Sequence, residues 1–224
     1  MAELYLVRHG QASFGAANYD QLSEMGAEQC RLLGEYFRER GLQFDRVVCG
    51  NMQRHHQSAQ AIFQGLGQGY DYQIHAGFNE FDFQTLLKLF SQHDPEQGIK
   101  DWRDAREVYR GLRQAMLAWS QQQFSVDGEM ETWQQFHQRV ADGLELARQP
   151  AKGKTLVVTS GGPICIGLSQ MLDFNAQTSI NLNLQCLNSA FSHCFYNKDS
   201  SHLSGFNAIP HLDTPAHRHM VSYS

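Results

Sequence analysis

Two turns that follow apolar runs carry the residues best suited to chemistry. Arg8 and His9 come directly after the run 4–7, and Ser160 comes directly after the run 155–159. A guanidinium offers a planar fork of donors that matches phosphate, so a guanidinium beside an imidazole suits an oxyanion. Arg is rarely buried without a partner, which favours such a site at the end of a buried strand. An Arg-His pair that only caps a strand at the surface stays open as the alternative.

Both turns are expected at one edge of a single sheet, because ligands of open α/β sheets bind beyond the carboxyl ends of the strands. Short apolar runs alternate with stretches whose apolar residues repeat at helical spacing. Strands are predicted at 4–7, 44–49, 70–75, 155–159, 187–196 and 202–206, and helices at 23–40, 53–64 and 163–172. This alternation predicts an α/β three-layer sandwich, with a mostly parallel central sheet and helices on both faces.

The segment 84–148 is predicted to be a helical insertion in this sheet fold. Its apolar residues share helix faces in two stretches, one that ends near Trp119 and one that begins at Trp133, with a turn at Gly128 between them. The chain shows no internal repeat and no linker that would separate two domains. We therefore expect a single domain over residues 1–224, in which the insertion forms a lid or cap.

Composition excludes several classes of protein. The 224 residues are 42% hydrophobic and 18% charged, which excludes a disordered or collagen-like chain. The net charge of −5 disfavours binding to nucleic acid through its phosphates. No stretch is apolar enough for a membrane span, and the first residues do not resemble a signal peptide. The five cysteines contain no Cys-x-x-Cys motif, so we expect free thiols and a cytoplasmic protein.

Six segments, in order along the chain, resemble motifs of the histidine phosphatase superfamily, which has the phosphoglycerate-mutase-like fold. They are Leu6-Val7-Arg8-His9-Gly10-Gln11, Leu22-Ser23-Glu24-Met25-Gly26, the segment 49–59 around Arg54, Phe78-Asn79-Glu80, the segment 131–140, and Val157-Val158-Thr159-Ser160-Gly161-Gly162. A lone Arg-His-Gly would be weak evidence. Asn188-Ser189 and Gly205-Phe206-Asn207 are similar to later segments of the family. The ordered set is specific, and the similarity runs from residue 4 to about residue 207.

The resemblance implies a phosphatase that acts on a small phosphorylated substrate. His9 would attack phosphorus in line and form a phosphohistidine, which water then hydrolyses. Arg8 and Arg54 would hold the phosphoryl oxygens through charge-assisted hydrogen bonds. Glu80 would protonate the leaving oxygen and later deprotonate the water, which requires a carboxyl pKa raised toward neutrality. The two guanidinium groups supply the positive charge, so neither a metal nor another cofactor is expected.

One position departs from the family pattern, because Ser160 stands where the family has a second histidine. A hydroxyl donates a hydrogen bond but carries no charge, which is expected to lower the rate about tenfold or more. In one hypothesis His55 or His56 supplies the missing imidazole. Adjacent helical residues point about 100° apart, so only one of the two is expected to reach the site, and of the two we prefer His55. In the other hypothesis the site only binds phosphorylated ligands. Asn18 is a further candidate for contact with phosphate.

Three assignments keep their alternatives. Asp82 lies close to Glu80 and is the second candidate for the acid. His211, His217 and His219 suggest a metal site, but no acidic or cysteine ligand shares their spacing, so we prefer a solvated tail. For the reaction, hydrolysis of a phosphomonoester is preferred, an impaired relative that binds phosphorylated partners comes second, and a mutase-type phosphotransferase comes third. The sequence names neither the substrate nor the oligomeric state.

Overall fold

A six-stranded sheet in the order β3-β2-β4-β1-β5-β6 forms the centre of the molecule. The computed structural model describes residues 1–13, 20–126, 128–149 and 151–223. The strands are β1 (Ala2–Arg8), β2 (Arg46–Cys49), β3 (Gln73–Ile74), β4 (Lys154–Thr159), β5 (Phe191–Tyr196) and β6 (Ser201–Ala208). The first four pair in parallel, whereas β5 and β6 add antiparallel strands at one edge. The prediction of a mostly parallel sheet is confirmed.

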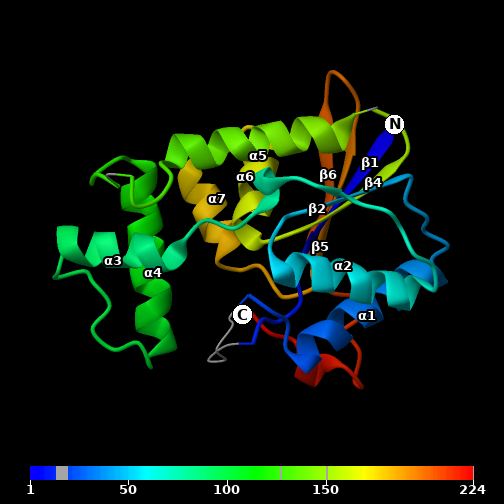
Figure 1. Ribbon diagram of the computed structural model, residues 1–224, viewed down its shortest axis with the longest axis horizontal. Coiled ribbons are helices and arrows are strands. Elements are labelled where there is room, and N and C mark those ends of the chain that lie inside the picture. The colour runs from blue at the N-terminus through cyan, green and yellow to red at the C-terminus, as the bar shows by residue number, and fades with distance from the viewer. Residues whose placement is uncertain (14–19, 127, 150, 224) are drawn as a thin grey trace.

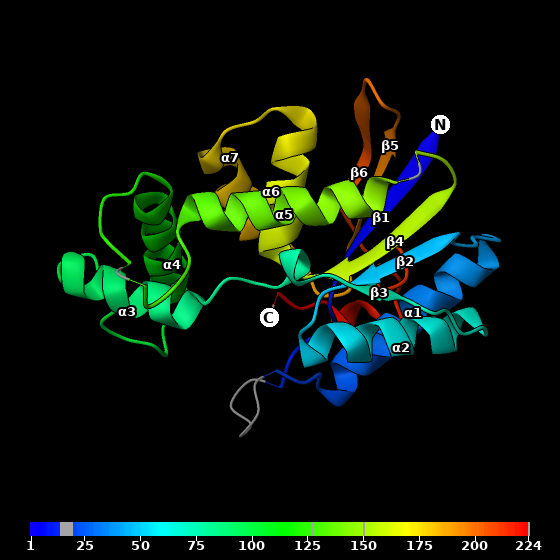
Figure 2. The ribbon, with the colours of Figure 1, turned by 45° about the horizontal axis from the view of Figure 1, so that its top comes forward.

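Helices cover both faces of the sheet, which gives the three predicted layers (Figures 1 and 2). One face carries α1 (Glu24–Glu39) and α2 (Gln53–Leu66), and the other carries α5 (Trp133–Arg148) and α6 (Gly161–Leu172). Three further helices are α3 (Phe83–His93), α4 (Ala105–Ser120) and α7 (Ala176–Asn183). In both views α3 and α4 lie beyond the end of the sheet, and α7 packs against α4 and α6. Within the described ranges, no helix is long and apolar enough to span a bilayer.

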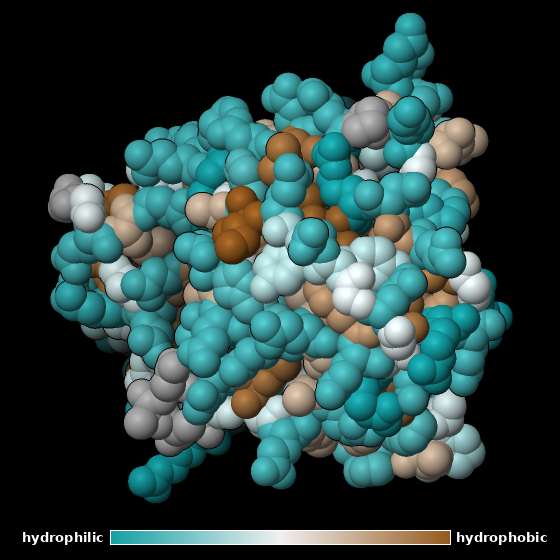
Figure 3. Space-filling model, turned by 45° about the vertical axis from the view of Figure 1, so that its right-hand side comes forward, coloured by the Kyte–Doolittle hydropathy of each residue, from teal (hydrophilic) through white to brown (hydrophobic). Residues whose placement is uncertain are grey.

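The core explains why β1 has apolar residues at each of positions 4–7. Tyr5 and Val7 belong to the cluster shared with α1 and α2, whereas Leu4 and Leu6 belong to the cluster shared with α5 and α6. Successive side chains of a strand point to opposite faces, so a strand that is covered on both sides must be apolar throughout. A third cluster around Trp119 fills the space between α3, α4 and α5. On the face drawn in Figure 3 the surface is largely hydrophilic, with hydrophobic residues in separate small areas.

The sequence analysis missed one helix and misjudged two segments. Helix α7 was not predicted, although the Asn175 side chain caps its start by accepting from the Thr178 N–H. The predicted helical insertion 84–148 contains, besides the turn near Gly128, a second non-helical stretch, residues 94–104, which connects α3 to α4. Strand β5 begins at Phe191 rather than at 187, since Ser189 turns the chain with a φ of 55°.

Candidate active site

His9 lies buried at the carboxyl end of β1, with its ring in a defined tautomer. Its Nδ1 lies 2.7 Å from the carbonyl oxygen of Gly10. A carbonyl can only accept, so Nδ1 carries the hydrogen and Nε2 keeps its lone pair. The Arg54 Nε–H donates to Nε2 at 3.2 Å. Burial and the charges of Arg54 and Arg8 hold the pKa of His9 well below 6.5, so the imidazole is neutral at neutral pH.

The backbone of His9 is fixed from both sides. Its N–H donates to the Thr159 carbonyl at 2.8 Å, and its carbonyl accepts from the Ser189 N–H at 3.1 Å. The next N–H along the chain, that of Gly10, donates to Ser58 Oγ at 3.1 Å. Strand β4, helix α2 and the turn before β5 thus hold the imidazole in place together.

Arg54 is the second residue of α2 and is almost fully buried beside His9. Its Nη1 donates to Asp20 Oδ1 at 2.8 Å, and Asp20 Oδ2 accepts from the Gln53 N–H at 2.9 Å. A carboxylate at a helix N-terminus is stabilised by the exposed N–H groups there. Asp20 therefore anchors both the guanidinium and the first turn of α2. The sequence analysis did not single out Asp20. A buried Arg needs a charged partner, so the prediction that Arg54 lies in the site could have prompted a search for an acidic residue near it.

Arg8 is held by main-chain carbonyls from two distant segments. Its Nη1 donates to the carbonyl of Cys186 and, at 2.7 Å, to that of Tyr223. The Nε–H is buried and has no hydrogen-bond partner among the described residues. The segment that ends the described chain therefore orients Arg8 and leaves one of its donors unused.

Glu80 lies between η1 (Ala76–Phe78) and α3, with its carboxyl group at the N-terminus of α6. Oε2 accepts from the Gly162 N–H at 3.1 Å, and Oε1 accepts from the Phe81 N–H at 3.2 Å. Burial raises the pKa of Glu80, although the Gly162 N–H, Arg54 and Arg8 oppose the shift. A Cβ at Gly162 would lie 2.1 Å from Oε1, so only glycine lets the carboxyl group approach this closely.

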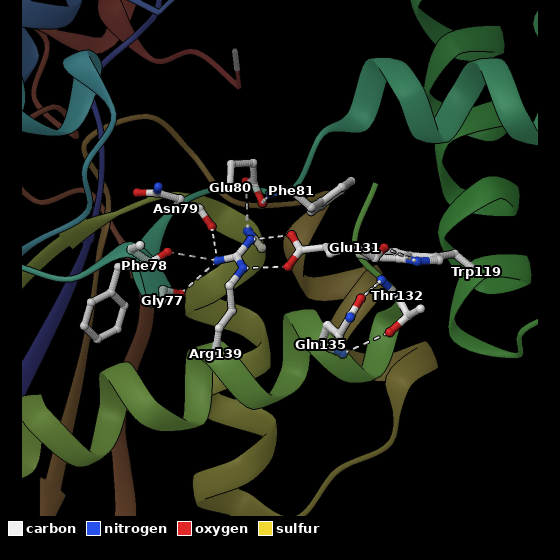
Figure 4. Close-up of polar contacts among 12 residues, drawn as sticks. Gly77, Phe78, Asn79, Glu80, Phe81, Trp119, Glu131, Thr132, Gln135 and Arg139 are labelled. Carbon is white, nitrogen blue, oxygen red and sulfur yellow. Dashed lines mark hydrogen bonds and ion pairs between the residues drawn. The ribbon is translucent and has the colours of Figure 1, made fainter. Parts of the chain in front are cut away.

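Arg139 of α5 positions the segment that carries Glu80 (Figure 4). Its guanidinium binds both carboxylate oxygens of Glu131, at 2.7 and 2.6 Å. The same group donates to the carbonyls of Asn79 at 2.6 Å and Gly77 at 3.0 Å. Because the guanidinium is planar and makes paired hydrogen bonds, it fixes both the distance and the orientation of the groups bound to it. Sequence reasoning noticed these residues only as part of a similar helix and assigned them no role.

Ser160 and His55 form a buried pair next to His9. Ser160 is the N-cap of α6, and its Oγ lies 2.7 Å from His55 Nε2. The His55 and His9 rings are 5.8 Å apart between centroids. Burial and the charge of Arg54 hold the pKa of His55 well below 6.5, so this imidazole is neutral too. His56 points elsewhere, with Nδ1 3.1 Å from the Tyr72 hydroxyl.

The structure places the remaining candidates as follows. Asn18 lies outside the described residues. Asp82 is the N-cap of α3, where one carboxylate oxygen accepts from the Gln84 and Thr85 N–H groups. Asp82 thus accepts from the start of its own helix α3, whereas the Glu80 carboxyl group accepts from the start of α6.

The prediction of a solvated histidine tail was wrong for His211. Its ring is buried, and Nε2 lies 2.8 Å from the Oγ of Ser189. Ser189 is also the residue whose N–H donates to the His9 carbonyl. Leu212 and Met220 pack against Leu32 of α1, so the segment 211–220 is held against α1 by apolar contacts. Among the described residues, no group of three or more His, Cys, Asp or Glu side chains could hold a metal ion.

Similarity to known proteins agrees with this geometry. Residues 4–209 match the histidine phosphatase superfamily (branch 1). The chain belongs to this superfamily. A probable phosphoglycerate mutase GpmB from Salmonella arizonae is 27% identical over 96% of this chain and 97% of its own. The sequence prediction of the family and of its fold is confirmed.

Solved structures show the same fold in proteins with different reactions. The alpha-ribazole phosphatase of Shigella flexneri has a TM-score of 0.64 at 20% identity, with 92% of this chain and 96% of that chain covered. The phosphoglycerate mutase of Bacillus anthracis has a TM-score of 0.66 at 16% identity, with 94% of each chain covered. Members of the superfamily similar to this chain thus include both phosphatases and mutases.

Proposed function

We propose that the protein is a phosphatase that hydrolyses a phosphomonoester through a phosphohistidine at His9, without a metal ion. The observation that carries the proposal is the neutral His9 ring, whose Nε2 lone pair faces the Arg54 guanidinium. A neutral imidazole is a nucleophile, and the guanidinium beside it can bind the phosphoryl oxygens. Most of the acceleration of phosphoryl transfer comes from such positioning and charge stabilisation.

The two steps use Glu80 first as an acid and then as a base. In the first step the Arg54 Nε–H leaves His9 Nε2 and turns to the phosphoryl group, Nε2 bonds to phosphorus, the bond from phosphorus to the leaving oxygen breaks, and the Glu80 proton moves to that oxygen. In the second step Glu80 takes a proton from water, the water oxygen bonds to phosphorus, and the bond to Nε2 breaks. The raised pKa of Glu80 favours the protonated form that the first step needs.

Arg8 and Arg54 would hold the phosphoryl group from two sides. The unpaired Nε–H of Arg8 supports this role, because a buried donor without a partner is costly unless a ligand satisfies it. The Asp20 carboxylate keeps Arg54 in place before substrate arrives. Asn18 stays a proposed further contact.

His55 is proposed to act through Ser160 rather than on the phosphoryl group itself. With its hydrogen on Nε2, His55 donates to Ser160 Oγ, and the Ser160 hydroxyl can then donate to a phosphoryl oxygen. With its hydrogen on Nδ1, toward the Gly50 carbonyl, His55 instead accepts from Ser160 and withdraws that donor. Ser160→Ala is therefore expected to lower kcat/KM about fivefold to tenfold. An unchanged kcat/KM would favour the second tautomer.

The substrate is proposed to be small, and the site of action the cytoplasm. The net charge of −5 disfavours binding to nucleic acid through its phosphates. All five cysteines are buried and free, which is typical of proteins in a reducing compartment.

Turnover of an aryl phosphate by the wild type and by His9→Ala, with and without a chelator, tests the proposal. We expect hydrolysis that survives chelation, an intact mass that shows a transient phosphoryl adduct, and loss of both in His9→Ala. Saturable binding of phosphate without turnover would favour the impaired relative, which the serine at position 160 makes the second candidate. Transfer of the phosphoryl group within a phosphoglycerate, faster than its hydrolysis, would favour the mutase.

A further inference from the structure

Two buried thiols lie in contact beside the active site. Cys165, in α6, and Cys186, in the turn after α7, have Sγ atoms 3.7 Å apart, and each residue is at most 3% exposed. Cys165 follows Gly162, whose N–H binds Glu80, by about one helical turn. The carbonyl of Cys186 accepts a hydrogen bond from Arg8. The thiol pair therefore joins the helix that holds the acid to the turn that holds a phosphate-binding group.

We propose that Cys165 and Cys186 form a reversible disulfide on exposure to hydrogen peroxide, and that this disulfide lowers turnover by displacing Arg8. The Cys186 thiolate attacks one peroxide oxygen, the O–O bond breaks, and the released hydroxide takes a proton to leave as water. The Cys165 sulfur then attacks the sulfenic sulfur of Cys186, the S–O bond breaks, and the thiol proton leaves with a second water. Two thiols and one peroxide thus give one disulfide and two waters.

The local charges favour this pair over the other cysteines. The hydrogen bond with Cys165 and the charge of Arg8 lower the pKa of the Cys186 thiol, although burial and Glu80 oppose the shift, whereas the pKa of Cys165 is raised; Cys186 is therefore the attacking group of the pair. Its thiol donates to the Leu182 carbonyl at 3.4 Å and must release this hydrogen bond when it ionises. Burial raises the pKa of Cys30 to about 11 and that of Cys49 and Cys194 to about 12. Within the described residues, no other two sulfur atoms are in hydrogen-bond contact. A transient disulfide of this kind is compatible with a reducing compartment.

Closing the disulfide brings the two sulfur atoms closer together and is proposed to move the turn that carries Cys186. A disulfide needs about 2.05 Å between the sulfur atoms, so they must approach by about 1.7 Å from their separation of 3.7 Å. Cys165 is fixed by the hydrogen bonds of α6, whereas Cys186 lies in a turn, so we expect Cys186 and its carbonyl to move. Arg8 would follow or lose its acceptor, and a shift of about 1 Å in a positioning group can cost about 100-fold in rate. The effect on turnover rests on the proposed phosphatase function, but the disulfide itself does not.

Oxidation of the full-length protein tests both parts. The protein is treated with hydrogen peroxide, its thiols are titrated in denaturant, and a non-reduced digest is mapped by mass spectrometry. We expect a peptide that links Cys165 to Cys186, a fall from five titratable thiols to three, and at least about a tenfold loss of aryl phosphate hydrolysis that dithiothreitol restores. Cys165→Ser should form no linked peptide and should stop at the sulfenic acid of Cys186, whereas the matched variant Cys194→Ser should still form the link.

The outcomes separate the two proposals. No linked peptide, or sulfinic acid at Cys186 in its place, overturns the disulfide. A linked peptide with an unchanged rate overturns its effect on Arg8. If the untreated protein shows no turnover, the phosphatase proposal fails. The peptide map then still tests the disulfide, and the affinity for vanadate before and after peroxide tests the displacement of Arg8.

Discussion

The two sides of the candidate site are built in different ways. On the nucleophile side, His9 ends a strand, Arg54 starts a helix, and a hydrogen bond of 3.2 Å joins them directly. On the acid side, Glu80 lies on a connection between elements, and Arg139 of α5 holds that connection by its carbonyls. The nucleophile side therefore depends on short links between neighbouring strand and helix ends. The acid side depends on one long side chain from a helix that lies across the sheet.

This difference predicts how each side responds to substitution. A change on the nucleophile side removes a group that would contact the phosphoryl unit itself, so its effect should not depend on the leaving group. A change on the acid side removes a proton donor or its support, so its effect should grow as the leaving group becomes more basic.

The largest effect is expected from Arg54→Ala. The variant loses a guanidinium that would bind the phosphoryl oxygens through charge-assisted, bidentate hydrogen bonds, each of which contributes about 1.5–3 kcal/mol. We expect kcat/KM to fall about 10²- to 10⁴-fold for aryl and alkyl phosphates alike. The exposed residue Arg38 of α1 provides the control, since Arg38→Ala should leave the rate unchanged. A loss confined to alkyl phosphates would place Arg54 on the acid side instead.

Glu80→Gln should come next and should distinguish the leaving groups. Without the proton donor, hydrolysis of an alkyl phosphate should fall about 10²- to 10⁴-fold, and that of an aryl phosphate with an acidic phenol far less. The pH profile gives a second measurement. Phosphorylation needs neutral His9, whose pKa is lowered, and protonated Glu80, whose pKa is raised. Wild-type activity should therefore decline as the pH rises through the Glu80 pKa, and Glu80→Gln should lack that decline.

The sequence predicts the residues at strand ends better than it predicts the side chains that hold distant segments together. Arg8, His9 and Ser160 follow apolar strands directly, so local pattern alone indicated that they share one edge of the sheet. The roles given to Arg54 and Glu80 came from the resemblance to the family, since neither residue stands out locally. The anchors Asp20 and Arg139 were missed, because each acts across more than 30 residues of chain. Sequence periodicity carries no information about which distant carbonyl a guanidinium will reach.

Arg139→Met should have a smaller effect with the character of the acid side. The variant keeps the apolar stem but loses the bonds to Glu131, Asn79 and Gly77, so Glu80 is positioned less firmly. We expect about a tenfold fall in kcat for alkyl phosphates, a smaller fall for aryl phosphates, and little further loss when Arg139→Met is added to Glu80→Gln. Arg148→Met, on the same helix but stacked on Tyr196, is the matched control. Equal losses for both classes of substrate would assign Arg139 a general structural role.

The smallest expected effect is on stability and comes from three buried histidines. His9, His55 and His211 are buried and have pKa values below 6.5, about 3 for His211. As the pH falls from 6.5 toward these values, the unfolded chain binds protons that the folded chain does not. The free energy of unfolding should therefore fall, by at most about 1.4 kcal/mol per pH unit for each group.

Urea unfolding of His211→Gln at pH 7 and pH 5 measures this contribution. The variant should lose less stability between the two pH values than the wild type, because one depressed pKa is removed. His219→Gln, at an exposed position of the same segment, should keep the wild-type dependence. An identical pH dependence in all three proteins would mean that His211 becomes protonated in the folded state, and its contact with Ser189 would then not require a neutral ring.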